Sequence, residues 1–568
     1  MSIRTRARTT TVRSLPTGLL LVPLFFLVLM PVGMLFYASL VDQPPLPGVG
    51  LQPLTLENYA AILSSGSLTA TMHSLVLGLG GTALAMVFGG GLAWLAARTD
   101  VPGKALVQLA GITSMFMSAL VGSFAWSLLA SPNAGLLNYV VEATGMSWRF
   151  DIYSLPGMIL VFGTYYAPYT FLFVYSALVL VNPDVEDAAR VHGASTRRAT
   201  TAITFPLLAP AVFGSAVLTF VLIVENFAVP QVLGSPAGIT TLPSTLYRLM
   251  NLAPAEANQA AAMGFLLMVV VATVVLLQRR FVTRRSFTTV TGKGFRPRPI
   301  ALGRWRWPAF GLAALYFVIS VVLPFAALFQ IALRRNAYID GFAGLFDASA
   351  FSLANFQEVW ESTEFQRSLQ NSLVIGLATA LGGGLFILVM SYVVYRTRAR
   401  GRRMVEYVAM APLAIPALVL GMGFLWTWYA LPLPLYGTLA ILALAFTTQF
   451  MPQGFRSISS SILQVHRDLE DSAIVAGASR LRSVREIVMP LLRSGLIGTA
   501  LLLLILSMRE LSAALFLFTG RTRVLSIYVF DLLEGNSGRA AAASLIYSAL
   551  LLVVVLIARR WMNADRSD

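Results

Sequence analysis

Twelve long apolar runs dominate this chain of 568 residues and leave it few possible folds. A helix needs about 20 mostly apolar residues to cross a bilayer, where only helices and closed barrels satisfy their backbone groups. Charged residues make up 12% of the chain, about half the fraction usual in soluble domains. The sequence therefore predicts an all-α polytopic membrane protein with about twelve transmembrane helices. The expected spans are 17–40, 72–97, 105–130, 155–181, 207–233 and 258–278 in the first half, and 308–333, 371–395, 405–429, 434–455, 491–517 and 540–558 in the second.

The basic residues lie in short segments between these runs, so the net charge of +16 does not indicate nucleic-acid binding. Loops rich in Lys and Arg stay in the cytoplasm. Segment 279–307 holds nine basic residues and no acid, whereas loop 336–370 is mainly acidic. We expect the first on the cytoplasmic side and the second outside. Arginines before the first run and after the last one place both chain ends in the cytoplasm, and the residues concerned are Arg4, Arg6, Arg8, Arg13, Arg559 and Arg560.

An internal repeat divides the chain into two halves. Segment 186–208 and segment 470–492 are identical at 12 of 23 positions without a gap, where chance would give about one or two. An even number of spans per half makes this a parallel repeat of two six-helix units. The predicted organisation is a cytoplasmic tail 1–16, a first membrane domain 17–278, a basic cytoplasmic linker 279–307, a second membrane domain 308–560 and a cytoplasmic tail 561–568.

The repeated segments are cytoplasmic loops with a common order of residue types. Acids come first, which suits a helix N-terminus, and small residues, a glycine and finally a proline follow. Because glycine inside a helix costs about 1 kcal/mol relative to alanine, we expect each glycine to separate two short helices, and each proline to open the next span. The first loop contains Glu186, Asp187, Ala188, Ala189, Gly193, Ile203 and Pro206, and the second contains Glu470, Asp471, Ser472, Ala473, Gly477, Ile487 and Pro490.

These loops resemble the EAA motif of ATP-binding-cassette importer permeases, with Asp in place of the usual Glu in both copies and Ser472 in place of an Ala. The resemblance covers nearly the whole chain and implies a type I importer permease in the bacterial inner (plasma) membrane. It also implies that each loop docks on a separate cytoplasmic ATPase, expected as a homodimer, and that an external solute-binding protein delivers the solute. The segments FGTYYAPYTFLFVYSAL and TGKGFRPRPIALGRWRW look most like those of ferric iron permeases. Thiamine, polyamine and phosphonate permeases are also similar.

Several other functions are disfavoured by what the sequence lacks. It has no phosphate-binding loop of the G-x-x-x-x-G-K-[ST] type, so we expect ATP to be used by the partner and no cofactor to be bound by this chain. Its three histidines are scattered and it has no cysteine, so no metal site is predicted. An ion-gradient-driven secondary transporter remains the alternative, although it would have no ATPase to dock. A receptor or scaffold would need a sizeable soluble domain.

Four polar residues fall inside predicted spans. Glu225 and Asn226 follow the first loop, and Arg509 and Glu510 follow the second at the same spacing of 284 residues. Ionisable groups at bilayer depth are costly and usually face a polar interior. One interpretation is that these residues form or gate a translocation path. The other is that Glu225 and Arg509 pair across the interface and hold the two halves together.

Overall fold

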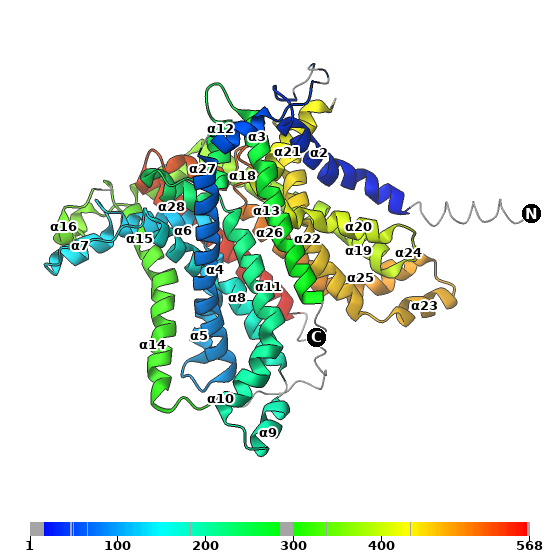
Figure 1. Cartoon of the computed structure of the whole chain (residues 1–568), viewed down its shortest axis with the longest axis horizontal. Helices are drawn as coiled ribbons and strands as arrows, with labels where there is room; N and C mark the ends of the chain where they lie inside the picture. Colours follow the sequence, from blue (N-terminus) through cyan, green and yellow to red (C-terminus); the bar gives the residue numbers. More distant parts are fainter. Residues whose placement is uncertain are drawn as a thin grey trace, which may run out of the picture.

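A computed structural model describes residues 16–45, 48, 50, 52–64, 66–181, 183–283, 299–336, 338–431 and 433–564. Within these ranges the chain is built of helices, with two isolated β-bridges and no longer strand (Figure 1). The all-α class is therefore confirmed. Most of the two predicted tails and of the predicted linker lies outside the described residues.

The first half contains the helices η1 (Phe25–Leu29), α2 (Met30–Ser39), α3 (Glu57–Ser64), α4 (Ser67–Arg98), α5 (Lys104–Thr113), η2 (Ser114–Phe116), α6 (Ala119–Ala130), α7 (Leu136–Ala143), α8 (Leu155–Leu180), α9 (Pro183–Val191), α10 (Thr196–Ala199), η3 (Thr200–Thr204), α11 (Phe205–Val224), η4 (Pro230–Gly234), η5 (Ser235–Ala237), α12 (Leu242–Met250) and α13 (Ala257–Thr283).

The second half contains η6 (Gly303–Trp305), α14 (Arg306–Phe317), η7 (Val318–Val322), α15 (Leu323–Ala332), α16 (Gly341–Gly344), η8 (Ala348–Ala350), α17 (Ala354–Glu361), α18 (Thr363–Ala378), η9 (Thr379–Gly383), α19 (Gly384–Arg396), α20 (Arg402–Met410), η10 (Ala411–Ala414), α21 (Ala417–Ala430), α22 (Leu439–Gln464), α23 (Arg467–Val475), α24 (Arg480–Ser483), η11 (Val484–Val488), α25 (Met489–Leu491), α26 (Arg493–Arg509), α27 (Leu525–Leu532) and α28 (Ser537–Ala564).

Fewer helices qualify as spans than the twelve predicted. Eight helices of the described residues are long and apolar enough to cross a membrane, and two pairs bent by more than 40° raise the number to ten. The predicted span 105–130 is instead broken into the short helices α5 and α6. The predicted span 434–455 lies in α22, which extends to Gln464 and carries glutamine, arginine and serine along its second half. Apolar runs in the sequence therefore overstate the number of continuous spans.

The break between α5 and α6 has a counterpart in the second half. Met117 is extended and the Ser118 hydroxyl caps α6 by accepting from the backbone N–H of Val121. In the second half Ile415 and Pro416 are extended between η10 and α21, where the helix axes differ by 115°. Backbone that leaves the helix at membrane depth is tolerated where it is covered by protein or lines a cavity. Both breaks are thus expected to face the interior.

The first span of each half packs on helices of the other half as well as on its own. The helix Pro16–Ser39 packs through α2 on α21 of the second half, and α14 packs on α5 of the first. Close packing inside the first half depends on glycine, because a methyl group at Gly89 of α4 would collide with the carbonyl oxygen of Ala167 in α8. The largest cluster of buried apolar side chains includes residues of both halves. The halves therefore form one membrane body.

Candidate functional site

The two repeated loops fold alike, as the sequence predicts. Each forms a short helix, α9 or α23, and two residues after its end lies a glycine with positive φ, +85° at Gly193 and +92° at Gly477. The amide of Ala194 donates to the carbonyl of Ala189, and that of Ala478 to that of Ala473. This i to i−5 bond after a left-handed glycine is the Schellman motif. The predicted break between two short helices is confirmed in both loops, which project from the body in Figure 1.

The prediction that proline opens the next span is wrong. The helix that follows Gly193 begins at Thr196 and continues unbroken to Val224, so Pro206 lies inside it. A π-turn at Thr200–Thr204 ends two residues before this proline, and such a wider turn accommodates a residue without an N–H. Pro490 also lies inside a helix, but there the axis bends by 74° between Leu491 and Arg493.

The first glutamate of each loop points inward. Glu186 is only 4% exposed, and its carboxylate accepts from Arg98 at the end of α4 and from the hydroxyl of Thr204. Arg98 is itself 1% exposed, and its Nε and Nη1 atoms have no hydrogen-bond partner among the described residues. Glu186 therefore anchors the first loop to the membrane body through one buried ion pair.

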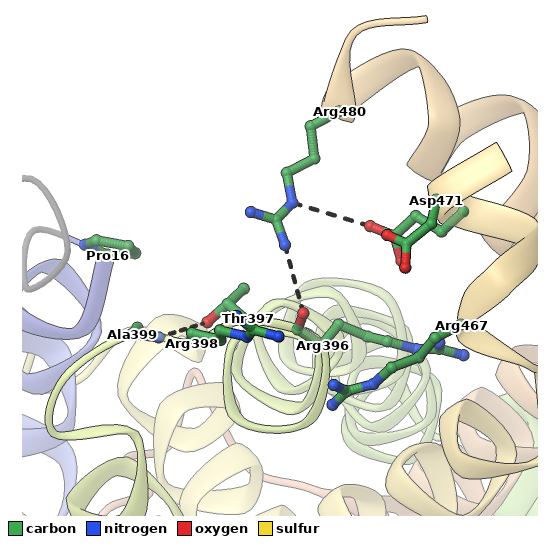
Figure 2. A pocket seen from close by; sticks show the side chains of 9 residues that line it. Pro16, Arg396, Thr397, Arg398, Ala399, Arg467, Asp471 and Arg480 are labelled. Carbon is green, nitrogen blue, oxygen red and sulfur yellow. Dashed lines mark hydrogen bonds and ion pairs between the residues drawn. The ribbon is translucent and has the colours of Figure 1, made fainter. Parts of the chain in front are cut away.

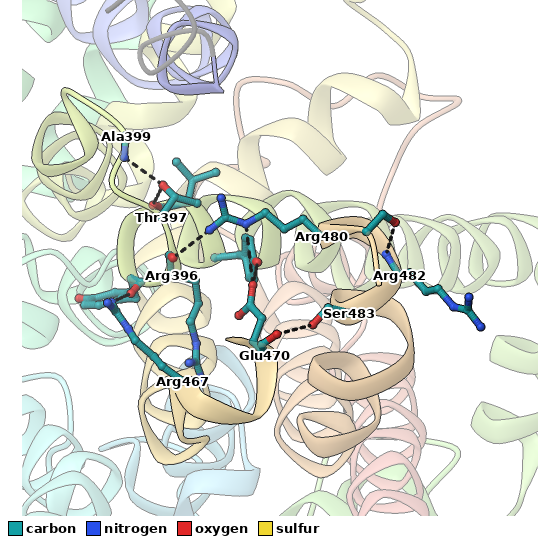
Figure 3. A network of polar contacts seen from close by, with 12 residues as sticks. Arg396, Thr397, Ala399, Arg467, Glu470, Arg480, Arg482 and Ser483 are labelled. Atoms are coloured by element: carbon teal, nitrogen blue, oxygen red, sulfur yellow. Dashed lines mark hydrogen bonds and ion pairs between the residues drawn. The ribbon is translucent and has the colours of Figure 1, made fainter. Parts of the chain in front are cut away.

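Glu470 is also buried but takes different partners. The Tyr392 hydroxyl donates to its carboxylate, and the Nε atom of Arg480 lies 3.8 Å away. Figure 3 shows Glu470 between Arg480 and Ser483, whose hydroxyl donates to the glutamate carbonyl. Arg396, which corresponds to Arg98, instead donates to the carbonyl of Ile462 over 2.8 Å and to that of Val465. The two loops are thus anchored at equivalent positions by different arginines.

The other motif residues are more accessible, and their exposure matches between the two loops except at Asp187 and Asp471. Ala188, Gly193 and Pro206 are exposed, as are Ser472, Gly477 and Pro490, while Asp187, Ala189, Ala473, Ile203 and Ile487 are intermediate and Asp471 is exposed. The apolar side chains of Val191 and Val475 are 85% and 88% exposed at the last position of α9 and of α23. Large exposed apolar side chains at one repeated position suit a protein contact.

A cavity of about 310 Å³ is lined by all four predicted intramembrane residues. Glu225 and Asn226 line it from the first half and Arg509 and Glu510 from the second, together with Tyr166 and other residues of both halves. The sequence places these four residues inside continuous helices, but α11 ends at Val224 and α26 at Arg509. They therefore sit where the two span helices unwind, which brings polar groups and free backbone to one place.

Two of these residues accept hydrogen bonds from the backbone that follows the end of each span helix. The side chain of Asn226 accepts from the amide of Val229 over 3.0 Å, and that of Glu510 accepts from the amide of Ala513 over 2.9 Å. Both acceptors lie three residues before their donors, as in helix capping. Asn226 also donates to the hydroxyl of Tyr166 over 2.9 Å. The two positions therefore play the same structural part in each half.

The equivalent pair Glu225 and Arg509 does not form an ion pair among the described residues. Arg509 instead donates from Nη2 to the backbone carbonyl of Met117 in the first half, over 3.2 Å. The hypothesis that Glu225 and Arg509 pair across the interface is therefore wrong. Arg509 still bridges the two halves, but through the carbonyl of Met117. Glu225 remains a lining residue of the cavity.

Sequence reasoning missed several residues of these sites. Arg98, Tyr392 and Arg480 anchor the loops, and Met117 receives Arg509. One signal was available, because Arg-Thr recurs at Arg98 and Arg396 at the ends of equivalent spans. No spacing in the sequence points to Tyr392 or to the carbonyl of Met117.

Comparison with known proteins agrees with this architecture. The sequence profile of the binding-protein-dependent transport system inner membrane component family matches residues 6–287 and 374–564. The ferric transport system permease protein FbpB of Actinobacillus pleuropneumoniae is 24% identical over 94% of this chain and 75% of its own length. A putative FbpB of Haemophilus influenzae is 23% identical over 89% of this chain and 78% of its own length.

Shorter relatives match one half of the chain. The putative 2-aminoethylphosphonate permease PhnV of Salmonella choleraesuis is 26% identical over 45% of this chain and 95% of its own length. A chain of a bacterial alginate importer of solved structure aligns with a TM-score of 0.36 and 19% identity, covering 46% of this chain and 96% of its own. The protein belongs to the family of inner membrane components of binding-protein-dependent transport systems and is a multi-pass permease subunit of an ATP-binding-cassette importer, with two family segments in one chain.

Proposed function

We propose that the loops around α9 and α23 dock on a separate cytoplasmic ATPase. We also propose that the cavity lined by Glu225, Asn226, Arg509 and Glu510, here called the central cavity, is part of the translocation path. The observation that carries this is the repeated geometry of the loops. Each has a buried glutamate that ties it to the membrane body and, five residues later, a valine that is more than 80% exposed. A force applied at the valine is thereby passed to the spans through a short helix with a fixed anchor.

The chain itself would supply the path and the coupling, and the partner would supply the ATP chemistry. In the proposed cycle a solute-binding protein delivers solute at the outer side, and ATP draws two identical ATPase subunits together. The loops then move as a pair and open the cavity outward. This assignment places both chain ends and the linker 279–307 in the cytoplasm, with membrane domains at 17–278 and 308–560. It gives this chain no bound cofactor and no ATP hydrolysis of its own.

Ferric iron is the substrate we propose, because relatives that align along nearly the whole chain are named as ferric transport permeases. The cavity chemistry is compatible, since two carboxylates and several neutral oxygen donors line it against one guanidinium group. Carboxylates and other oxygen groups are the ligands that hard cations prefer. A phosphonate is the second candidate, because a 2-aminoethylphosphonate permease matches one half. Thiamine and polyamines are further candidates from sequence resemblance alone.

Docking is tested by replacing the exposed valines. The chain would be purified from native membranes in mild detergent, as wild type and as Val191→Glu/Val475→Glu, and the ATPase that co-purifies would be identified by mass spectrometry. We expect the double variant to lose the ATPase while keeping its thermal stability, because both side chains are exposed. The control is Leu63→Glu, an exposed side chain of α3 at 84%. Equal capture of the ATPase by all three proteins would contradict docking and favour a gradient-driven transporter.

The substrate is tested separately in proteoliposomes that contain the full importer and its binding protein. Uptake of radioactive ferric iron, dependent on internal ATP, is the expected result. Uptake of 2-aminoethylphosphonate in its place would identify the second candidate. Uptake that follows an ion gradient and needs no ATP would exclude ATP-driven import of either substrate.

A further inference from the structure

A basic pocket lies beside the second loop, apart from the central cavity. Its volume is about 480 Å³, and it is formed by the start of the first span, the turn after α19, and the helices α23 and α24 (Figure 2). Four arginines and two carboxylates line it, an excess of two positive charges. The lining residues are Pro16, Arg396, Thr397, Arg398, Ala399, Arg467, Glu470, Asp471 and Arg480.

Part of this charge is already compensated within the chain. Arg480 lies beside Glu470, whose carboxylate also accepts from Tyr392. Arg467 donates to the carbonyl of Tyr395. Arg398 is exposed, and its guanidinium has no hydrogen bond or ion pair within the described part of the chain. The pocket therefore keeps one guanidinium group, that of Arg398, without a partner within the described part of the chain.

A buried polar atom in the wall supports the same conclusion. Arg396 is 7% exposed, and its Nη2 atom donates to two backbone carbonyls. Its Nε atom is buried and has no hydrogen-bond partner among the described residues. Unpaired buried donors are uncommon in folded proteins, and an ordered water or an ion is one partner that can satisfy such an atom.

The first half lacks three of these arginines at the equivalent positions, although Arg98, which corresponds to Arg396, also has an Nε atom without a hydrogen-bond partner among the described residues. Sequence alignment of the repeats pairs Arg398 with Asp100, Arg467 with Pro183 and Arg480 with Thr196. There Asp100 accepts from the amide of Leu302 over 2.7 Å, so the turn after α4 is closed by the segment that precedes α14. Shared coupling geometry therefore does not require these three arginines.

The position of the pocket indicates the ligand. Pro16 begins the first membrane-spanning helix and Arg396 ends the span Thr363–Arg396, so the pocket lies at the membrane surface. Guanidinium groups match the geometry of phosphate oxygens, and basic pockets between spans bind phospholipid head groups. We propose that this pocket binds a phosphate group, carried by an anionic phospholipid or by a small soluble phosphate compound.

The test uses the full chain with one charge reversed. Arg398→Asp introduces the residue found in the first half, and Arg400→Asp is its control, because Arg400 is an exposed arginine of the same turn that does not line the pocket. Both variants change the net charge equally. In nanodiscs of mixed phosphatidylglycerol and phosphatidylcholine, native mass spectrometry would count the phosphatidylglycerol retained by each protein.

A lipid ligand predicts that wild type and Arg400→Asp retain phosphatidylglycerol, and that Arg398→Asp holds it about tenfold more weakly, as the loss of one charged hydrogen bond implies. A second arm titrates inorganic phosphate into the full chain in phosphatidylcholine nanodiscs, by calorimetry. Binding in this arm that Arg398→Asp abolishes would identify a soluble phosphate compound instead. The proposal is overturned if neither arm detects binding, or if the two variants behave alike. Its outcome is independent of the transported substrate.

Discussion

Arg509 in the second half donates a hydrogen bond to the carbonyl oxygen of Met117 in the first, over 3.2 Å. Each residue stands where a helix is interrupted, Arg509 at the end of α26 and Met117 just before α6. A free carbonyl at a helix break can accept such a donor without losing a helical hydrogen bond. This contact joins the halves at the central cavity.

Removing the Arg509 side chain should loosen the interface between the halves. We expect Arg509→Met to cost about 1.4 kcal/mol of contact energy. That corresponds to about a tenfold shift of population toward conformations in which Arg509 and Met117 lie apart. Because the chain has no cysteine, spin labels can be attached at cysteines that replace Val191 and Val475. Their distance distribution should change in Arg509→Met and stay unchanged in Arg521→Met, an exposed control.

Replacing the Glu225 carboxyl group by an amide should impair transport if the cavity is the path. Its carboxyl group lines the cavity and has no ion-pair partner among the described residues. We expect Glu225→Gln to lower uptake by about tenfold or more at normal expression, since an ionisable group at this depth is retained only where it interacts with polar surroundings. Glu142→Gln, an exposed residue outside the cavity, should transport normally. Full uptake by Glu225→Gln would exclude a role in the path.

The two buried glutamates should differ in their effect on stability. Glu186→Gln leaves the buried Arg98 without its anion, which typically costs about 3–5 kcal/mol. Glu470→Gln should cost less, because the side chain of Arg480 is 59% exposed and can be solvated by water. Thermal unfolding in detergent would compare the two. The double variant Arg98→Met/Glu186→Met should recover much of the loss, since no buried charge then remains; equal melting temperatures for both single variants would contradict this account.

The glycines of the loops should be needed for their backbone conformation alone. A Cβ atom at Gly193 or Gly477 would meet nothing within 4 Å, but φ is +85° and +92° there. The left-handed conformation costs other residues about 1–2 kcal/mol. Gly193→Ala/Gly477→Ala should therefore lower the melting temperature and reduce ATPase stimulation. Gly90→Ala, in open space within the helix α4, should be neutral or stabilising.

The sequence predicts the parts of this structure that depend on local patterns. The repeat fixes equivalent positions, and the glycine after a short acidic helix predicts the turn in both loops. The number of continuous spans was not predictable, because hydropathy does not register the breaks at Met117 and Ile415. The same limitation put Glu225 and Glu510 inside helices. Pattern also cannot tell that Arg98 pairs with Glu186 while Arg396 does not pair with Glu470, since that depends on packing between distant segments.

The helix after the first loop is continuous from Thr196 to Val224, whereas its counterpart bends by 74° after Leu491. Two identical ATPase subunits would apply equal displacements to unequal mechanical elements. The continuous helix would transmit its displacement directly to Glu225. In the bent counterpart, part of the same displacement would change the angle after Leu491 before it reached Arg509. One importer built from a symmetric motor and a repeated membrane chain would then open its two sides in sequence.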